Sequence, residues 1–336
     1  MENNKVLYKE DVCERFSQRM HRKSKKEFRT WAIQEAQKMG YIAKEEKSLL
    51  AKNIVIGNPE KAEIIVGAHY DTPPSLSPFI VKHQFLTIAC AYPLALTYSI
   101  KGLMKFTTEI APASMMGVAI NGVGVLAQVV NFGVFAYMMG FLGNANQKNY
   151  DDNSSGVLSV LNLMNEYKQL PKEQRDKIAF VLFDNEEKML LGSLAYASQH
   201  KKEIKNQSVI NLDCVGVAET MNLLYVGKDL PEIVKEFEKE IKENTSLKPN
   251  VKITGPLSMS DHMSFIGAKE HICLLAKDKS IYSLVSHIHS KKDNFIKEQN
   301  ILDVVDIVRS YTNKKLFSTK KHLTQAITKE QIDFSL

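Results

Sequence analysis

The sequence predicts an α/β protein built on a parallel or mixed sheet. The main observation is an apolar run, Ile178 to Phe183, that ends abruptly in the acidic stretch Asp184 to Glu187. Such a run, bounded by charge, is typical of a strand buried on both faces. With 336 residues the chain can bury a large core, as one α/β domain or as two smaller ones. Three further strands are expected at Glu63 to Ala68, Ser208 to Leu212 and Ile272 to Leu275.

Composition narrows the class of protein. The net charge of +6 is modest and does not by itself indicate a nucleic-acid partner, so we expect none. The four cysteines are scattered without the paired spacing of a metal site, which favours reduced thiols in a reducing compartment. The N-terminal residues are followed by no apolar core, and we therefore expect no cleavable signal peptide.

The first helix is expected near residues 28–39, where apolar residues fall on one face and Gly40 can end the helix. Further helices are expected from Leu190 to His200, around Phe237, and from about Gln299 to Lys315. A basic cluster overlaps the start of the first helix, and we interpret it as a solvated face, with a membrane surface as the alternative. Its members are Arg19, Arg22, Lys23, Lys25, Lys26 and Arg29.

A hydrophobic insert interrupts the chain at residues 79–147. Neither Phe85 to Ile100 nor Ile110 to Asn146 contains a charged side chain, and a bilayer-spanning helix needs about 20 apolar residues. We predict an inserted hydrophobic helical hairpin that contacts membrane lipid, with the catalytic domain on the cytoplasmic side. A buried hairpin or an oligomer interface over the active-site mouth is the alternative. One α/β domain would then comprise 1–78 and 148–336, with 1–50 as its N-terminal helical part.

Residues suited to metal chemistry follow the predicted strands and loops. The alternative is that these acidic residues cap helices, Asp152 at the helix that follows it and Glu187 at the helix that begins near Leu190. A mixed set of imidazole and carboxylate ligands, however, suits zinc, with cobalt or manganese possible. Glu186, beside a ligand and itself free, can take a proton from water. The candidate metal ligands are His69, Asp152, Glu187, Asp213 and His289.

Five ordered segments resemble the co-catalytic zinc aminopeptidases, a family that includes bacterial leucyl-type aminopeptidases and, as relatives, the glutaminyl cyclases. The resemblance spans about Ile54 to Leu316 without the insert, and implies one zinc-exopeptidase-like domain with a central mixed, mostly parallel sheet flanked by helices. The segments are Gly67-Ala-His-Tyr-Asp71, Asp151-Asp-Asn-Ser-Ser-Gly156, Phe183-Asp-Asn-Glu-Glu187, Asn211-Leu-Asp213 and His289-Ser-Lys-Lys-Asp293.

The same resemblance implies an exopeptidase that acts on peptides through two zinc ions and an activated water. It implies Glu186 as the general base and Asp71 as the residue that orients His69. By the same resemblance Asp152 bridges the metals, with Glu187 and His289 on one and His69 and Asp213 on the other.

The sequence departs from the family pattern at the last ligand. Some relatives have a tyrosine before that histidine, where it stabilises the oxyanion, whereas this chain has Ile288. His287, Tyr70 or His262 could replace it, and His287 also rivals His289 as the ligand. Two other functions remain open: a glutaminyl-cyclase-like acyltransferase with one zinc, and an inactive, membrane-anchored scaffold with a peptidase fold.

Overall fold

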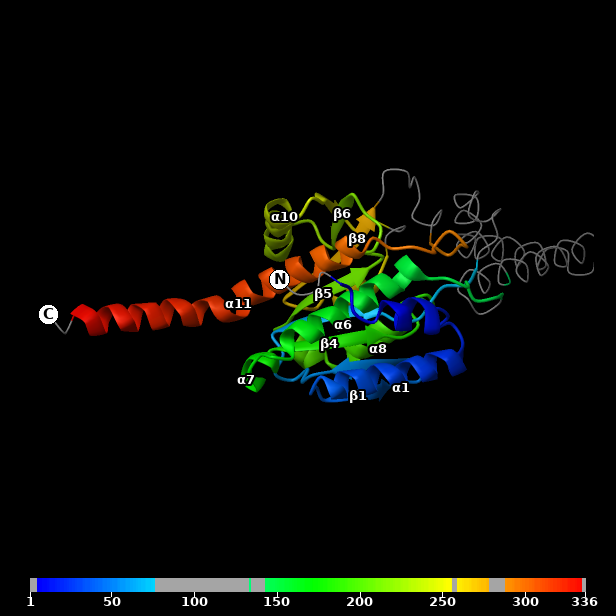
Figure 1. Cartoon of the computed structure of the whole chain (residues 1–336), viewed down its shortest axis with the longest axis horizontal. Coiled ribbons are helices and arrows are strands. Elements are labelled where there is room, and N and C mark those ends of the chain that lie inside the picture. The colour runs from blue at the N-terminus through cyan, green and yellow to red at the C-terminus, as the bar shows by residue number, and fades with distance from the viewer. Residues whose placement is uncertain (1–4, 76–132, 134–142, 256–258, 278–287, 334–336) are drawn as a thin grey trace, which may run out of the picture.

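An eight-stranded sheet forms the centre of the protein, with strand order β1-β2-β4-β3-β5-β8-β6-β7. The computed structural model describes residues 5–75, 133, 143–255, 259–277 and 288–333 (Figure 1). The strands are β1 (Ala43–Lys47), β2 (Lys52–Ile56), β3 (Ile64–His69), β4 (Ile178–Phe183), β5 (Ser208–Asp213), β6 (Thr220–Tyr225), β7 (Lys248–Ile253) and β8 (Glu270–Lys277). The helices are η1 (Asp11–Arg15), α1 (Arg22–Lys38), η2 (Tyr150–Ser155), α6 (Gly156–Tyr167), α7 (Lys172–Arg175), α8 (Leu191–Gln199), α9 (Lys201–Ile204), α10 (Glu232–Asn244), η3 (Asp261–Phe265) and α11 (Glu298–Asp333).

The four central strands, β4, β3, β5 and β8, are mutually parallel. The strands β2 and β6 run antiparallel to them on either side. The predicted fold class, an α/β protein with a mixed, mostly parallel sheet flanked by helices, is therefore confirmed. Parallel strands that are covered on both faces read as continuous apolar runs. That is why the sequence predicts all four central strands.

Helices cover both faces of the sheet (Figure 1). Alternate strand residues point to opposite faces: Ile64 and Val66 of β3 pack in the larger core cluster, together with residues of α1, α6, α10 and α11. Ile65, between them, packs in a second cluster with Tyr196 of α8 and Phe265 of η3. Both faces of the central strands are therefore buried, and their polar residues gather at the strand ends.

The outer strands do not have this pattern. Strand β1, with the sequence Ala-Lys-Glu-Glu-Lys, is mostly charged and half-exposed. Strand β7 is partly or fully exposed along its length. An edge strand is held by backbone hydrogen bonds to one neighbour and needs little apolar surface. The sequence therefore did not predict these two strands.

The predicted hydrophobic hairpin, and with it the proposed contact with membrane lipid, lies almost wholly outside the described residues. In the part of the chain that the structure covers, no helix has both the length and the apolar character needed to cross a bilayer.

Candidate metal centre

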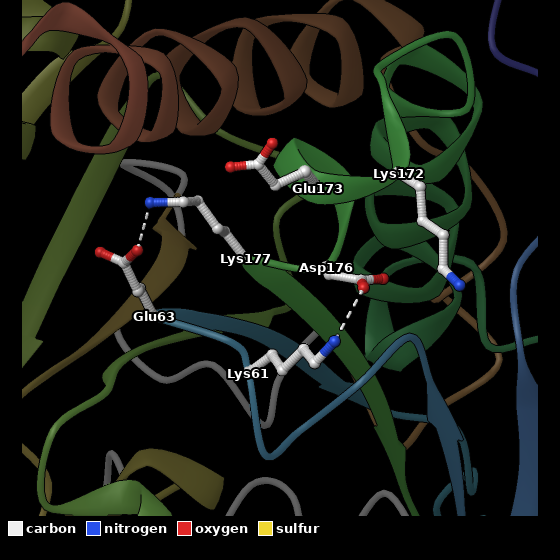
Figure 2. A pocket seen from close by; sticks show the side chains of 6 residues that line it. All are labelled: Lys61, Glu63, Lys172, Glu173, Asp176 and Lys177. Atoms are coloured by element: carbon white, nitrogen blue, oxygen red, sulfur yellow. Dashed lines mark hydrogen bonds and ion pairs between the residues drawn. The ribbon is translucent and has the colours of Figure 1, made fainter. Parts of the chain in front are cut away.

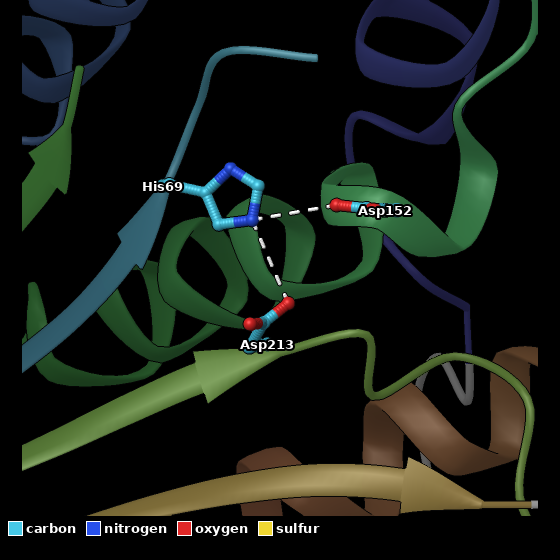
Figure 3. Close-up of side chains that lie close together, drawn as sticks. All are labelled: His69, Asp152 and Asp213. Atoms are coloured by element: carbon cyan, nitrogen blue, oxygen red, sulfur yellow. Dashed lines mark ion pairs between the residues drawn. The ribbon is translucent and has the colours of Figure 1, made fainter. Parts of the chain in front are cut away.

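Two neighbouring parallel strands deliver the first candidate ligands. His69 is the last residue of β3 and Asp213 the last of β5, so both side chains lie at the carboxyl edge of the sheet. Asp152 reaches the same edge from η2, just before α6. The His69 Nε2 atom lies 3.4 Å from Asp152 Oδ1 and 3.5 Å from Asp213 Oδ1 (Figure 3). The fold thus brings together three residues from a stretch of sequence in which the first, His69, and the last, Asp213, are 144 positions apart.

A second group forms on the other oxygen of Asp152. Asp152 Oδ2 lies 3.1 Å from Nε2 of His289, which in turn lies 3.5 Å from Oε2 of Glu187. Glu187 follows β4, and His289 precedes α11. The five candidate ligands therefore form two groups, each able to hold one metal ion, that share Asp152.

The donor set fits divalent metal ions. Two ligand atoms on one tetrahedral zinc ion lie about 3.3 Å apart, because each zinc bond is about 2.0–2.1 Å long. The nitrogen-to-oxygen separations of 3.1–3.5 Å in both groups agree with that geometry. Moreover, Glu187 Oε1 is buried and accepts no hydrogen bond from the described residues. A buried carboxylate oxygen without a partner is costly, and a cation would compensate it.

The electrostatics of this edge favour positive charge. Burial lowers the pKa of His69, but the carboxylates around it, Glu186 foremost, raise it well above its ordinary value. Burial raises the pKa of Asp152, but bonds from His289 and His69 lower it by more, so Asp152 stays ionised. Burial and the neighbouring carboxylates also raise the pKa of Glu187. A field that holds a proton on a buried imidazole also attracts a metal ion.

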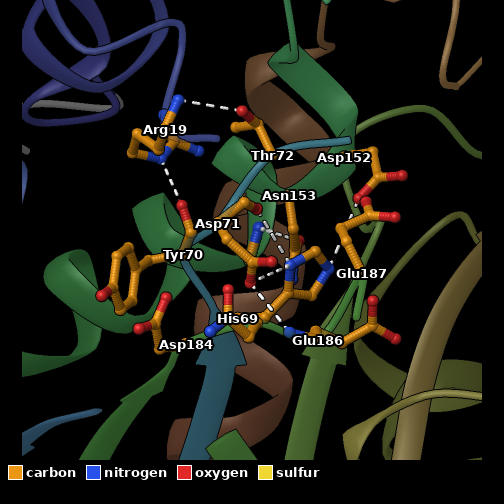
Figure 4. Close-up of polar contacts among 12 residues, drawn as sticks. Arg19, His69, Tyr70, Asp71, Thr72, Asp152, Asn153, Asp184, Glu186 and Glu187 are labelled. Atoms are coloured by element: carbon orange, nitrogen blue, oxygen red, sulfur yellow. Dashed lines mark hydrogen bonds and ion pairs between the residues drawn. The ribbon is translucent and has the colours of Figure 1, made fainter. Parts of the chain in front are cut away.

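Asp71 and Asp293 hold the ligand-bearing segments. The backbone carbonyl of Asp71 lies 3.1 Å from Nδ1 of His69, and its carboxylate accepts the Glu186 N–H at 3.0 Å (Figure 4). Asp293 accepts the backbone N–H of Asp151 at 2.7 Å and that of Asp152 at 3.1 Å. Asp71 was assigned an orienting role from the sequence. Asp293 was not, although it closes the motif that begins at His289.

The acidic residues do not serve as helix caps. Neither α8 nor α6 has a side-chain hydrogen bond at its N-cap within the described structure. The carboxylate of Asp151 instead accepts the backbone N–H of Gly216 at 2.7 Å. Capping therefore does not explain why acids gather after β4 and before α6.

The other residues considered for the oxyanion have different surroundings. The Tyr70 hydroxyl donates to the carbonyl of Lys52 at 3.0 Å and accepts from Arg29 at 2.9 Å, so it points away from the ligands. His262 is buried, with Nε2 at 2.7 Å from the Thr254 hydroxyl. His287 lies outside the described residues. Beside His262, Asp261 has a buried carboxylate that accepts no hydrogen bond from described residues, and the sequence analysis gave it no role.

The prediction of a solvated basic face is wrong for half of the basic cluster. Arg19, Lys25 and Arg29 are 0%, 6% and 3% exposed. Lys25 pairs with Asp184 at 2.7 Å, which explains why the first acid after β4 is not available to a metal. Arg19 and Lys25 turn toward loops that follow β3 and β4, whereas Arg29 bonds Glu45 of β1 and the Tyr70 hydroxyl (Figure 4 shows Arg19).

A charged hollow of about 450 Å³ lies away from this centre, at the amino ends of β3 and β4 (Figure 2). Two ion pairs cross its lining, from Lys61 to Asp176 at 3.7 Å and from Lys177 to Glu63 at 2.5 Å. Ligands of open α/β sheets bind at the carboxyl ends of the strands. The hollow is therefore at the wrong edge to be the active site.

Comparison with solved structures shows what this fold is similar to. BSAP, a zinc aminopeptidase from Bacillus subtilis, is 18% identical with a TM-score of 0.50, over 79% of this chain and 50% of that one. The LapA aminopeptidase of Legionella pneumophila is 13% identical with a TM-score of 0.56, over 93% and 68%. A glutaminyl cyclase of Bacteroides thetaiotaomicron is 16% identical with a TM-score of 0.57, over 90% and 94%.

At these identities the structural likeness shows the fold alone. The chain spans only half the length of the Bacillus enzyme. A search of curated proteins gave no match. The model of peptidase family M28 matches residues 143–312, slightly more than half of the chain. That range contains Asp152, Glu187, Asp213 and His289, and it begins after His69. The chain therefore belongs to peptidase family M28.

Proposed function

We propose that this protein is a metal-dependent exopeptidase, specifically an aminopeptidase that hydrolyses the first peptide bond of substrates with a free N-terminus. The observation that carries the proposal is the sharing of Asp152 between two ligand groups, one with His69 and Asp213, the other with Glu187 and His289. Two ligand groups with a common carboxylate support two metal ions, zinc in the first place and cobalt or manganese as substitutes.

When bound, a metal pair supplies an acidified water and positive charge for the carbonyl oxygen of the substrate. Glu186 belongs to neither ligand group within the described chain. Its backbone N–H is fixed by the carboxylate of Asp71, which places a free carboxylate next to Glu187. In this role Glu186 accepts a proton from the attacking water and passes it to the leaving amine.

Asp71 completes the machinery by fixing the tautomer of His69. With the Nδ1–H of His69 donating to the carbonyl of Asp71 at 3.1 Å, Nε2 keeps its lone pair for a ligand bond. The partner of a ligand imidazole sets both its orientation and its basicity. Asp71 is therefore an orienting residue for one ligand and for the general base.

A glutaminyl-cyclase-like acyl transfer through one zinc ion is the second candidate. It is supported by the structural likeness to the Bacteroides cyclase, with a TM-score of 0.57 over 94% of that chain. One zinc would need only one of the two ligand groups. The second complete group, around His69, favours the aminopeptidase.

The deciding experiment measures metal content per chain together with turnover of aminoacyl amides and of peptides with N-terminal glutamine. We expect two metal ions and chelator-sensitive release of N-terminal residues. One metal ion with cyclisation of N-terminal glutamine would establish the second candidate instead. A chain that neither binds metal nor turns over either substrate, even when supplied with zinc or cobalt, would be an inactive scaffold.

A further inference from the structure

Arg19 is a fully buried cation that lies between two of the ligand-bearing segments. It is 0% exposed, and burial lowers the pKa of its guanidinium to about 10, which leaves it charged at neutral pH. A buried charge is tolerated only where hydrogen bonds and opposite charges compensate it. Among the described residues no carboxylate forms an ion pair with Arg19, so hydrogen bonds compensate its charge.

Four oxygen atoms accept those bonds. Within the N-terminal segment, Phe16 O lies 2.6 Å and Val12 O 3.1 Å from the Nη1 atom of Arg19. Outside it, the Nε atom donates to the Tyr70 carbonyl at 2.5 Å, and the Nη2 atom to the Ser154 hydroxyl at 3.0 Å. The planar guanidinium thus links two distant loops in a fixed geometry.

Both loops carry a candidate ligand. Tyr70 follows His69 directly, and Ser154 lies two residues after Asp152. The backbone of Arg19 strengthens the first link, because its N–H donates to the Thr72 hydroxyl at 2.9 Å (Figure 4). The atoms that must share a metal, His69 Nε2 and Asp152 Oδ1, are 3.4 Å apart.

We propose that Arg19 is a positioning residue of the metal centre, which sets the separation of His69 and Asp152; the inference rests on the proposed metal-dependent function. Arg19 lies outside residues 143–312, the range that matches family M28. Through Arg19, the N-terminal segment supports the proposed metal centre. The sequence had indicated only a basic surface there.

The first test compares Arg19→Lys with Arg29→Lys in the full-length chain. Lysine keeps the charge, but its single ammonium group cannot span the acceptors that the guanidinium links. Arg29 is the matched control: it is also buried, at 3% exposed, but among the described residues it bonds the side chains of Glu45 and Tyr70 rather than a ligand-bearing loop backbone. Zinc affinity, measured by competition with a chromophoric chelator, should fall about 10–100-fold in Arg19→Lys and stay close to wild type in Arg29→Lys.

A spectroscopic readout separates positioning from loss of stability. With Co²⁺ alone as the probe, the visible absorption bands report ligand geometry in the folded fraction. We expect the bands of Arg19→Lys to shift in energy or intensity, and those of Arg29→Lys to match wild type. A merely destabilising substitution would lower the amount of folded protein and leave the bands in place.

A double-mutant cycle tests the path through Ser154, and it serves even if Arg19→Lys folds poorly. Ser154→Ala removes one acceptor and should weaken zinc binding in the same direction by a smaller factor. In the double variant, zinc affinity should fall by less than the product of the two single fold-losses. The reason is that both substitutions break the same link between Arg19 and Ser154.

Equal zinc affinity in wild type, Arg19→Lys and Ser154→Ala would overturn the proposal, as would equal losses in Arg19→Lys and Arg29→Lys. These outcomes are distinct from failure of the proposed function. A wild-type protein that binds zinc through this arrangement without hydrolysing peptides would leave the positioning role intact. A wild-type protein that binds no zinc or cobalt would remove both.

Discussion

Glu186 and Glu187 are identical side chains one position apart, yet their surroundings differ. Glu187 Oε2 lies 3.5 Å from His289 Nε2, within a ligand group. Glu186 lies outside both groups of the described chain, and its backbone N–H is bound by Asp71. A loop that leaves the end of β4 turns successive side chains in different directions, so that one carboxylate can hold a metal and the other a proton.

Replacing Glu186 with Gln should separate these two roles. We expect the ratio kcat/KM for an aminoacyl amide to fall by about 10²–10⁴, the usual contribution of a general base, with metal content unchanged. The matched control is Glu187→Gln, which should lower metal content as well. Elemental analysis and initial rates on the same samples provide the measurement. Normal turnover in Glu186→Gln would remove its assignment as the base.

His262 makes the stability depend on pH. Burial, followed by the influence of His271, lowers the pKa of His262 to about 3, so the folded state keeps it neutral where the unfolded state binds a proton below pH about 6.5. Its contribution to stability is therefore lost as the pH falls from about 6.5 toward 3. Between pH 7 and pH 5 the loss should be about 2 kcal/mol.

Urea unfolding of the metal-free protein at pH 7 and pH 5 measures this loss. Substituting His262 with Gln retains a hydrogen-bonding group for Thr254, which lies 2.7 Å from His262 Nε2, and removes the titration. The stability of His262→Gln should therefore depend less on pH than that of wild type. Equal pH dependence in both proteins would contradict the prediction.

At the level of the elements, α6 packs tightly against the end of β5. A Cβ atom on Gly156, the first residue of α6, would lie 2.4 Å from the carbonyl oxygen of Leu212 and 2.5 Å from the side chain of Asn153. Only a residue without a side chain allows the helix to start so close to the strand that ends in Asp213. This contact fixes η2, and with it Asp152, against β5.

Gly156→Ala should destabilise the protein by about 1–3 kcal/mol, the usual cost of overpacking. Gly267 supplies the control, because no described atom lies within 4 Å of a Cβ built there, and Gly267→Ala should change stability by less than about 0.5 kcal/mol. Denaturant midpoints of the two variants make the comparison. Similar values for both would show that α6 can move away from β5 without cost.

The elements that the sequence predicted are those with a strong local pattern. The four central strands are apolar throughout, and α10 has Ile233, Phe237 and Ile241 on its buried face. The edge strands β1 and β7 depend on pairing with β2 and β6, which no local pattern records. Their existence is a property of the sheet rather than of their own residues.

The candidate ligands were found because short motifs follow strands and loops in the order of a known family. What the motifs could not show is which neighbours hold them. Arg19 looked like one of several surface cations, because the sequence alone does not distinguish a buried arginine from an exposed one. Its burial depends on Tyr70 and Ser154, which are 51 and 135 residues away. Contacts at that range emerge only from the complete fold.

For the whole molecule, we expect the proposed metal centre to contribute to stability as well as to chemistry. Three candidate ligand carboxylates, Asp152, Glu187 and Asp213, converge with two histidines, and without a cation the carboxylates repel one another. Chelation should therefore lower the melting temperature. A ligand present at 100 times its dissociation constant stabilises by about 2.7 kcal/mol, which for a chain of 336 residues corresponds to a shift on the order of 4 °C.

Calorimetry with and without EDTA measures this shift, and restoring zinc should reverse it. Glu187→Gln, with a weakened second group, should show a smaller shift than wild type. If bound metal is present and its removal leaves the melting temperature unchanged, the metal lies somewhere other than between these ligands.

The backbone N–H of Asp152 donates to the carboxylate of Asp293, which lies 141 residues further along the chain. On the ribosome, Asp152 emerges long before the segment that carries His289 and Asp293. The shared carboxylate is therefore expected to lack its backbone support until that later segment has been translated. Because metal binding requires assembled ligands, loading should follow translation of the segment that carries His289 and Asp293. Until then, a nascent chain would be exposed to zinc before its candidate ligand carboxylates have come together.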